Sequence, residues 1–174
     1  MTDLAARGFG IILNSMRLYL VQHGAAVGKD IDPERPLSEQ GVYDVKAIAG
    51  VLRTAGIRVE RTWHSGKRRA EQTAAILARA VMKTAVVEQV DGISPNDPVA
   101  VFAEDADVWE QDTLVVGHLP FMARLVSLLT TGDPEQAVVS YSPGSVVCLE
   151  RLDTHWAVCW MLRPGLFADR VDAA

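Results

Sequence analysis

Short runs of β-forming residues alternate with longer amphipathic stretches along most of this chain. Each run is bounded by polar, glycine or proline residues, as strands in a packed domain commonly are. Thr113–Gly117 is the clearest buried strand among them. The pattern predicts strands at residues 17–21, 61–64, 84–88, 113–117, 145–152 and 155–162.

Four stretches between these strands place apolar residues at helical spacing. The first begins after Ser38, a suitable N-cap, and ends at Gly56. The second follows the turn at Ser65 and Gly66, the third runs from about residue 94 toward 104, and Pro120 suits the first position of the fourth. The apolar stripes are Val42, Val45, Ile48, Ala49 and Leu52 in the first helix, Ala70, Ala74, Leu77 and Val81 in the second, and Phe121, Leu125 and Leu128 in the fourth.

The alternation of strand and helix predicts an α/β fold with a mostly parallel sheet and a C-terminal hairpin joined at residues 153–154. A chain of 174 residues fits one domain with a single core. Met16 stands immediately before the first strand and can itself serve as a start. We therefore expect residues 1–15 to be an N-terminal extension and residues 16–174 to form a single domain.

The composition is that of an ordinary globular protein, with 49% hydrophobic and 22% charged residues. No apolar stretch approaches the roughly 20 residues that a membrane helix needs, so we expect a cytoplasmic protein without a membrane partner. The net charge of −5 argues against a nucleic-acid partner, because a duplex-binding surface is rich in lysine and arginine.

Chemically useful side chains follow three of the predicted strands. His23 comes directly after the first strand, Ser65 follows the second with Arg69 one helical step further on, and His118 follows the fourth. Because the carboxyl ends of parallel strands meet at one edge of a sheet, we expect these side chains to lie together. A helix N-terminus beside a guanidinium binds a phosphate dianion well. One imidazole can then attack phosphorus, while the other donates a hydrogen bond to the phosphoryl oxygens.

This scheme requires no metal and no other cofactor. Two isolated histidines without a nearby cysteine or carboxylate partner also fall short of the usual zinc ligand set. A single histidine after a strand is more often structural, so the hypothesis depends on all three strand ends together.

The same residues resemble the motifs of a known family. Gln22-His23-Gly24, the stretch from Ser65 to Thr73 and Gly117-His118-Leu119-Pro120 are similar to the three motifs of the histidine phosphatase superfamily. The small size and the loop at residues 35–38 resemble its SixA branch of phosphohistidine phosphatases. The likeness covers residues 16 to about 164 and implies a three-layer α/β/α sandwich. It also implies that His23 becomes transiently phosphorylated, that Arg69 binds phosphate and that His118 assists the transfer.

The sequence departs from the family pattern at two positions. Gln22 stands where an arginine normally precedes the nucleophile, and Gly66 stands in place of a proline. An amide still donates hydrogen bonds to phosphate, but without a charge, so the loss of affinity is on the order of 1–3 kcal/mol. Arg35, on a loop expected to lie over the pocket, is the candidate to compensate. We therefore include Gln22 and Arg35 among the phosphate-binding residues.

Longer family members place a proton-donating carboxylate in an inserted segment. Asp97 is the one candidate in this chain, and its alternative interpretation as a helix N-cap is the stronger one. An alkyl phosphate ester needs a protonated leaving group, whereas phosphohistidine leaves readily as neutral imidazole. A site without a strong acid therefore favours phosphohistidine as the substrate.

Three functions remain open, in order of preference. The first is a metal-independent phosphatase that removes phosphate from phosphohistidine on a partner protein. The second is a phosphomonoesterase acting on a small phosphorylated metabolite. The third is a phosphate-binding protein with weak or no turnover, made possible by Gln22.

The C-terminal hairpin carries two further predictions. With a two-residue loop, Cys148 lies directly opposite Cys159, and we expect two free, buried and unreactive thiols. Trp156 and Trp160 are expected on one face of the last strand, in the core.

Overall fold

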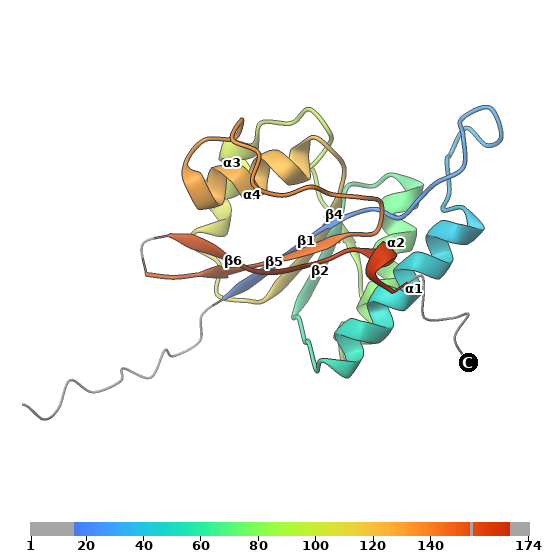
Figure 1. The fold of residues 1–174 in the computed structure, drawn as a ribbon, viewed down its shortest axis with the longest axis horizontal. Coiled ribbons are helices and arrows are strands. Elements are labelled where there is room, and N and C mark those ends of the chain that lie inside the picture. The colour runs from blue at the N-terminus through green and yellow to red at the C-terminus, as the bar shows by residue number, and fades with distance from the viewer. Residues whose placement is uncertain (1–15, 154, 168–174) are drawn as a thin grey trace, which may run out of the picture.

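The computed structural model describes residues 16–153 and 155–167, so the predicted extension at residues 1–15 lies outside the described part and stays a prediction. Strands and helices alternate along the described residues (Figure 1). The elements are β1 (Arg17–Gln22), α1 (Glu39–Thr54), β2 (Arg61–His64), α2 (Arg68–Val81), β3 (Glu88–Gln89), α3 (Val99–Ala106), β4 (Thr113–Gly117), α4 (Phe121–Thr131), β5 (Val146–Arg151), β6 (Trp156–Leu162) and the 3-10 turn η1 (Pro164–Leu166).

The strands form one sheet in the order β3-β2-β4-β1-β5-β6. β3, β2, β4 and β1 run parallel to one another, while β5 is antiparallel to β1 and β6 is antiparallel to β5. The prediction of an α/β fold with a mostly parallel sheet and a C-terminal hairpin is therefore confirmed.

Helices cover both faces of the sheet, with α1 and α2 on one side and α3 and α4 on the other (Figure 1). Successive residues of β1 point to opposite faces, so Leu18 and Leu20 pack under α3 and α4, whereas Tyr19 and Val21 pack under α1 and α2. Each of these side chains is at most 1% exposed, as a strand buried on both faces requires. The expected three-layer sandwich is confirmed.

The first two helices follow the sequence pattern closely. The Ser38 hydroxyl accepts the backbone N–H of Gly41 at 3.1 Å, which confirms Ser38 as the N-cap of α1. The chain leaves that helix through Gly56, at φ 72°. The predicted stripe of α2 is buried over its whole length, at Ala70, Ala74, Leu77 and Val81.

Three element boundaries differ from the predictions. β3 is limited to residues 88–89, because Thr84–Val86 are exposed and the Val86 N–H turns back to the Thr84 carbonyl instead of pairing with β2. α3 begins at Val99 after Pro98, so Asp97 is not its N-cap; the Asp97 carboxylate instead accepts the backbone N–H of Ser94 at 2.7 Å. Pro120, joined to Leu119 by a cis peptide bond, is the N-cap of α4 and not its first residue.

A β-bulge changes the register of the hairpin. The Leu152 N–H bonds to the His155 carbonyl at 2.8 Å, as the predicted loop requires, but the register shifts between Cys148 and Leu149. Cys148 therefore pairs with Trp160, so the predicted pairing with Cys159 is wrong.

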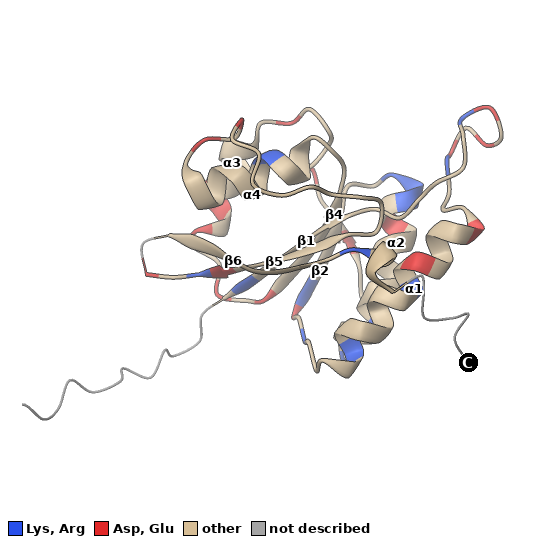
Figure 2. Cartoon of the chain, viewed as in Figure 1, with Lys and Arg blue, Asp and Glu red and all other residues tan. Residues whose placement is uncertain are grey.

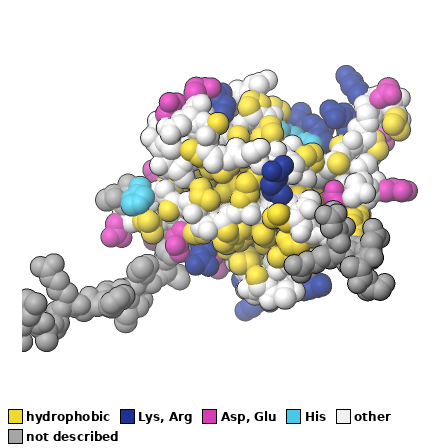
Figure 3. Space-filling model, in the orientation of Figure 1, with side chains coloured by type: hydrophobic (Ala, Val, Ile, Leu, Met, Phe, Trp, Pro, Cys, Tyr) yellow, Lys and Arg dark blue, Asp and Glu magenta, His cyan; other side chains and the backbone are white. Residues whose placement is uncertain are grey.

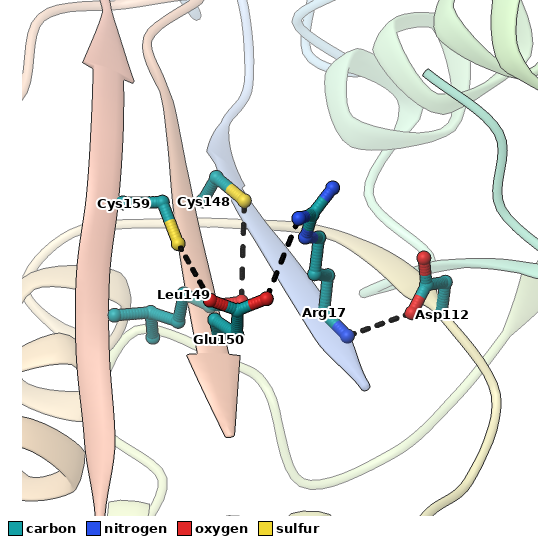
Figure 4. Close-up of polar contacts among 6 residues, drawn as sticks. All are labelled: Arg17, Asp112, Cys148, Leu149, Glu150 and Cys159. Atoms are coloured by element: carbon teal, nitrogen blue, oxygen red, sulfur yellow. Dashed lines mark hydrogen bonds and ion pairs between the residues drawn. The ribbon is translucent and has the colours of Figure 1, made fainter. Parts of the chain in front are cut away.

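The bulge also separates side chains that strict alternation would keep together. Both thiols are free, but only Cys148 is buried, whereas Cys159 is exposed with its thiol 3.9 Å from the Glu150 carboxylate (Figure 4). Trp156 packs in the core under α3 and α4, and Trp160 stacks on Tyr19 on the opposite face with ring centroids 5.9 Å apart. The prediction that the two tryptophans share one face is wrong.

Among the described residues, no helix is both long and apolar enough to cross a membrane. Figure 2 shows Lys and Arg at the start of α2 and on the loop between β1 and α1, where acidic residues also lie. Further basic residues are spread over α1, α4 and the strands.

Candidate active site

The carboxyl ends of β1, β2 and β4 bring His23, Ser65 and His118 to one edge of the sheet. β1 and β4 are neighbours in register at Gln22 and Gly117, and the His23 N–H donates to the Gly117 carbonyl at 3.1 Å. The imidazole rings of His23 and His118 lie 4.9 Å apart between centroids. In Figure 3 a histidine surface lies among Lys and Arg side chains, beside the loop that follows β1.

The two hydrogen bonds of the His23 ring define its protonation. Nδ1 lies 2.7 Å from the carbonyl oxygen of Gly24, which can only accept, so Nδ1 carries a proton. Nε2 receives the Nε–H of Arg69 at 3.0 Å, and a guanidinium can only donate. The ring is therefore neutral, with the lone pair on Nε2.

Electrostatics keeps His23 neutral. Burial lowers the pKa of His23 to about 4, and the positive charges of Arg69 and Arg35 also lower it, while the hydrogen bond to Gly24 acts in the opposite direction. A neutral imidazole with a lone pair is the form that can attack phosphorus.

His118 is almost completely buried, with 2% of its surface exposed. Its Nε2 lies 2.5 Å from the Ser65 hydroxyl, and its Nδ1 is buried without a hydrogen-bond partner among the described residues. Burial, together with the nearby His23, Arg69 and Lys67, lowers the pKa of His118 to about 3. His118 is thus also neutral at physiological pH.

Arg69 is placed by the first turn of α2. The Thr73 hydroxyl donates to the Arg69 carbonyl at 2.7 Å and accepts the N–H of Gly24 at 3.1 Å, which ties this helix to the residue after His23. At Gly24 a Cβ atom would stand 2.7 Å from the Val45 side chain, so only glycine fits this close approach.

The loop at residues 28–36 carries Arg35 to the site. Arg35 has φ 50°, and its Nε–H donates to the Val27 carbonyl at 3.3 Å. Its charge lowers the pKa of both His23 and Arg69. The end of the loop is anchored to α2, because the Gln72 side-chain oxygen accepts the Leu37 N–H at 2.7 Å.

Gln22 lies at the end of β1, beside these groups. Its backbone N–H donates to the Ser145 carbonyl and its own carbonyl accepts the Gly144 N–H, each at 3.1 Å. Its side-chain oxygen Oε1 is buried and has no hydrogen-bond partner among residues 16–153 and 155–167. The site therefore holds a polar group whose hydrogen-bonding capacity is not used within the chain.

Gly66 takes a conformation that the expected proline cannot adopt. It has φ 78°, whereas proline requires φ near −65°. Its N–H also donates to Nδ1 of His64 at 3.2 Å, and proline has no N–H. Glycine in place of proline at residue 66 therefore goes with a turn between β2 and α2 that a proline could not form.

Two other groups stay away from the imidazoles. The Asp97 carboxylate is engaged by Ser94 and is not among the groups that act on the pKa of either histidine. Arg68 is exposed and forms an ion pair with Glu71 at 3.0 Å. Within the described residues, no group of three or more His, Cys, Asp or Glu side chains is arranged to hold a metal ion.

Sequence reasoning placed Ser65 at the sheet edge with the two histidines but did not predict that its hydroxyl contacts His118. The available signal was its place directly after β2, on the same sheet edge as the two histidines.

Comparisons with known proteins agree with this arrangement. A model of the histidine phosphatase superfamily (branch 1) matches residues 18–93, which include His23 and Arg69. The chain is 29% identical over 124 residues to an uncharacterized protein of Picosynechococcus sp., covering 67% of this chain and 74% of that protein. It is 26% identical over 123 residues to the phosphohistidine phosphatase SixA of Escherichia coli (strain K12), covering 68% and 76%.

Solved structures share the fold. The protein histidine phosphatase SixA complexed with tungstate has a TM-score of 0.76 at 22% identity, covering 87% of this chain and 99% of that one. A phosphoserine phosphatase from Entamoeba histolytica, in complex with 3-phosphoglyceric acid, has a TM-score of 0.63 at 12% identity, covering 84% and 96%. Taken together, the family model and the matching sequences show that the chain is similar to members of the histidine phosphatase superfamily, and the phosphohistidine phosphatase SixA is among the proteins it resembles.

Proposed function

We propose that this protein is a phosphatase that removes phosphate from phosphohistidine on a partner protein, with His23 as the nucleophile. The observation that carries the proposal is the unprotonated Nε2 of His23 beside the Arg69 guanidinium. The proposed nucleophile, Nε2 of His23, is thus in direct contact with the cation that would bind the phosphate, the Arg69 guanidinium. The similarity to a phosphohistidine phosphatase supports the same reaction.

The proposed reaction has two transfers. The phosphoryl group binds Arg69, Arg35 and the start of α2, whose charges and N–H groups stabilise its oxygens. His23 Nε2 forms a bond to phosphorus while the nitrogen–phosphorus bond of the substrate breaks, and the Nδ1 proton stays on the bond to Gly24. A water molecule then attacks phosphorus, which releases inorganic phosphate and restores neutral His23.

The charges at the site favour phosphohistidine over a phosphate ester. Apart from the two histidines, the charged side chains that shift the pKa of either imidazole are Arg35, Lys67 and Arg69, all cationic, among the described residues. An alcohol leaving group needs a proton from an acid. A phosphohistidine that carries a proton on its second ring nitrogen leaves as neutral imidazole and needs none. The cationic surroundings therefore suit a phosphoramidate substrate.

One observation supports a second function, phosphate binding with weak turnover. Gln22 replaces the expected cation and holds a buried acceptor atom without a partner. The Gln22 amide can donate hydrogen bonds to a phosphoryl oxygen but carries no charge, so the pocket binds the transferring phosphoryl group less tightly than an arginine would allow.

The experiment compares turnover on a phosphotransfer protein phosphorylated on histidine with turnover on sugar phosphates. We expect faster release of phosphate from the protein. His23→Ala should abolish both turnover and acid-labile labelling, whereas His118→Ala should slow transfer and leave some label.

Three other outcomes of this experiment would contradict the proposal. Faster turnover of sugar phosphates would favour a small-molecule phosphomonoesterase. Phosphate binding without turnover would favour the second function. Acid-labile phosphate on His118 would overturn the assignment of His23.

A further inference from the structure

Ser65 makes a short contact with the second histidine of the site. Its hydroxyl oxygen lies 2.5 Å from Nε2 of His118. β2 and β4 pair in parallel with His64 opposite Val116, so both side chains follow neighbouring strands at the same sheet edge. Among the described residues, the Ser65 hydroxyl has no other hydrogen-bond partner.

This contact allows two arrangements of protons in a neutral imidazole. If the Ser65 hydroxyl donates to Nε2, the ring proton sits on Nδ1, which is buried and has no acceptor among the described residues. If Nε2–H donates to Ser65, the unpaired atom is the Nδ1 lone pair. Buried N–H groups without an acceptor are rarer in proteins than unpaired acceptors, which favours the second arrangement.

In the second arrangement the Ser65 hydroxyl proton is available to another acceptor. Ser65 precedes Arg69 by one helical step, and Arg69 contacts Nε2 of His23. The rings of His23 and His118 are 4.9 Å apart. The Ser65 hydroxyl thus contacts the ring that lies next to His23, at the sheet edge that carries both histidines.

We propose that Ser65 is a further catalytic residue: it accepts the Nε2–H of His118 and donates its own hydroxyl proton, as a hydrogen bond, to a phosphoryl oxygen. His118 then acts through Ser65, as a positioning residue that aims the hydroxyl. No proton is transferred in this step; the hydrogen bond strengthens as negative charge develops on the phosphoryl group. This inference rests on the proposed function, since it assigns a group to the same transfer.

The first test does not depend on activity. Nitrogen-15 NMR of the histidine side chains in the free protein reports which ring nitrogen of His118 carries the proton. We expect the Nε2–H form in the wild type and in Ser65→Thr, which keeps the hydroxyl, and a mixture of the two forms in Ser65→Ala. An Nδ1–H form in the wild type, or an unchanged ratio in Ser65→Ala, would overturn the proposal.

The second test uses kinetics on the phosphohistidine protein. Ser65→Ala is expected to lower kcat by about a hundredfold, as loss of one such donor does elsewhere, with a smaller change in KM. Because the two residues act as a unit, the double variant Ser65→Ala with His118→Ala should be no slower than His118→Ala alone. Ser65→Thr should restore most of the rate, and Ser140→Ala, which removes an exposed hydroxyl, is the control.

The outcomes separate this inference from the proposed function. Two results would refute the role of Ser65 without affecting the proposed phosphatase activity. The first is a kcat of the double variant that falls by the product of the two single effects. The second is a Ser65→Thr variant that does not recover the rate although its circular dichroism and thermal unfolding are unchanged. If the wild type has no turnover, the proposed function fails. In that case the NMR result and the affinity for inorganic phosphate decide on Ser65, with weaker binding in Ser65→Ala expected.

Discussion

Arg69 donates its Nε–H to Nε2 of His23 over 3.0 Å, and the same nitrogen is the one that we propose attacks phosphorus. The guanidinium thus holds the nucleophile unprotonated before a phosphoryl group arrives. It has five N–H donors, so it can turn toward phosphoryl oxygens when they bind and release the lone pair. Binding of the substrate and exposure of the nucleophile are therefore coupled through one side chain.

Replacement of Arg69 by glutamine is expected to weaken binding of inorganic phosphate by about tenfold to a hundredfold, since hydrogen bonds to charged groups contribute about 1.5–3 kcal/mol. Isothermal titration calorimetry measures the affinity. Arg68→Gln is the matched control, because Arg68 is exposed and engaged with Glu71. Equal losses in the two variants would show that the effect is one of general charge and not of this contact.

Both site histidines should stay neutral well below the usual histidine pKa of 6.5. Burial lowers the pKa of His23 to about 4 and that of His118 to about 3, so above pH 5 each ring keeps its lone pair. NMR titration of the ring protons checks this, with a histidine-containing peptide as the reference. The two rings are close enough to titrate as a pair, and midpoints near 6.5 for both would contradict the prediction.

The same shifts set the sign of the pH dependence of stability. Between pH 6.5 and about 4 the unfolded chain holds protons on these histidines that the folded chain does not. The contribution of these groups to the free energy of unfolding is therefore largest above pH 6.5, and it decreases as the pH is lowered toward 4. Urea unfolding at pH 7 and pH 5 measures this, and we expect a lower free energy of unfolding at pH 5. The same curves show whether the protein stays folded during the NMR titration.

Gln22→Arg is expected to tighten inorganic phosphate binding by about tenfold, or about 1.4 kcal/mol, and to keep or raise activity. The variant replaces a buried acceptor that has no partner in the described chain by a group with donors alone. Gln22→Glu, which keeps the shape and adds a negative charge, should weaken binding. A large fall in activity in Gln22→Arg would show that the pocket is built around the amide, with Arg35 serving as the cation.

Restoring the family's proline at residue 66 should destabilise this protein. Gly66→Ala is expected to cost about 1–2 kcal/mol, because φ 78° is unfavourable for a residue with a Cβ, and Gly66→Pro should cost more, because it also removes the N–H bonded to His64. Gly50→Ala, in the interior of α1 with open space around it, is a control expected to stabilise by about 0.5–1 kcal/mol. Urea unfolding measures all three, and a stable Gly66→Pro protein would refute the argument.

The native protein should react slowly with one equivalent of a thiol reagent and with two after unfolding. Cys159 is exposed and Cys148 is buried, and burial raises the pKa of Cys148 to about 12 and that of Cys159 above its ordinary value (Figure 4). Mass spectrometry counts the labels, and Cys159→Ser should remove the native reaction. Rapid labelling of both thiols would contradict the bulged register.

Elements whose signals are local could be predicted from the sequence. Ser38 and Gly56 delimit α1, the stripe of α2 is buried where periodicity places it, and β2 has the predicted bounds. The strand ends carrying His23 and His118 also follow from local runs, because parallel strands place their carboxyl ends on one edge. The sequence by itself therefore determined the α/β class and the meeting of the two imidazoles.

Only the tertiary structure decided features that depend on neighbours distant in the chain. The bulge that separates Cys148 from Cys159 brings Trp160 onto Tyr19, a contact that no alternation pattern along β6 contains. The length of β3 depends on what β2 can pair with. The contact of Ser65 with His118 and the burial of the Gln22 side-chain oxygen depend on how three segments pack at the sheet edge. Periodicity reports which face a side chain takes, whereas hydrogen bonds between remote segments are set by the packing of the whole fold.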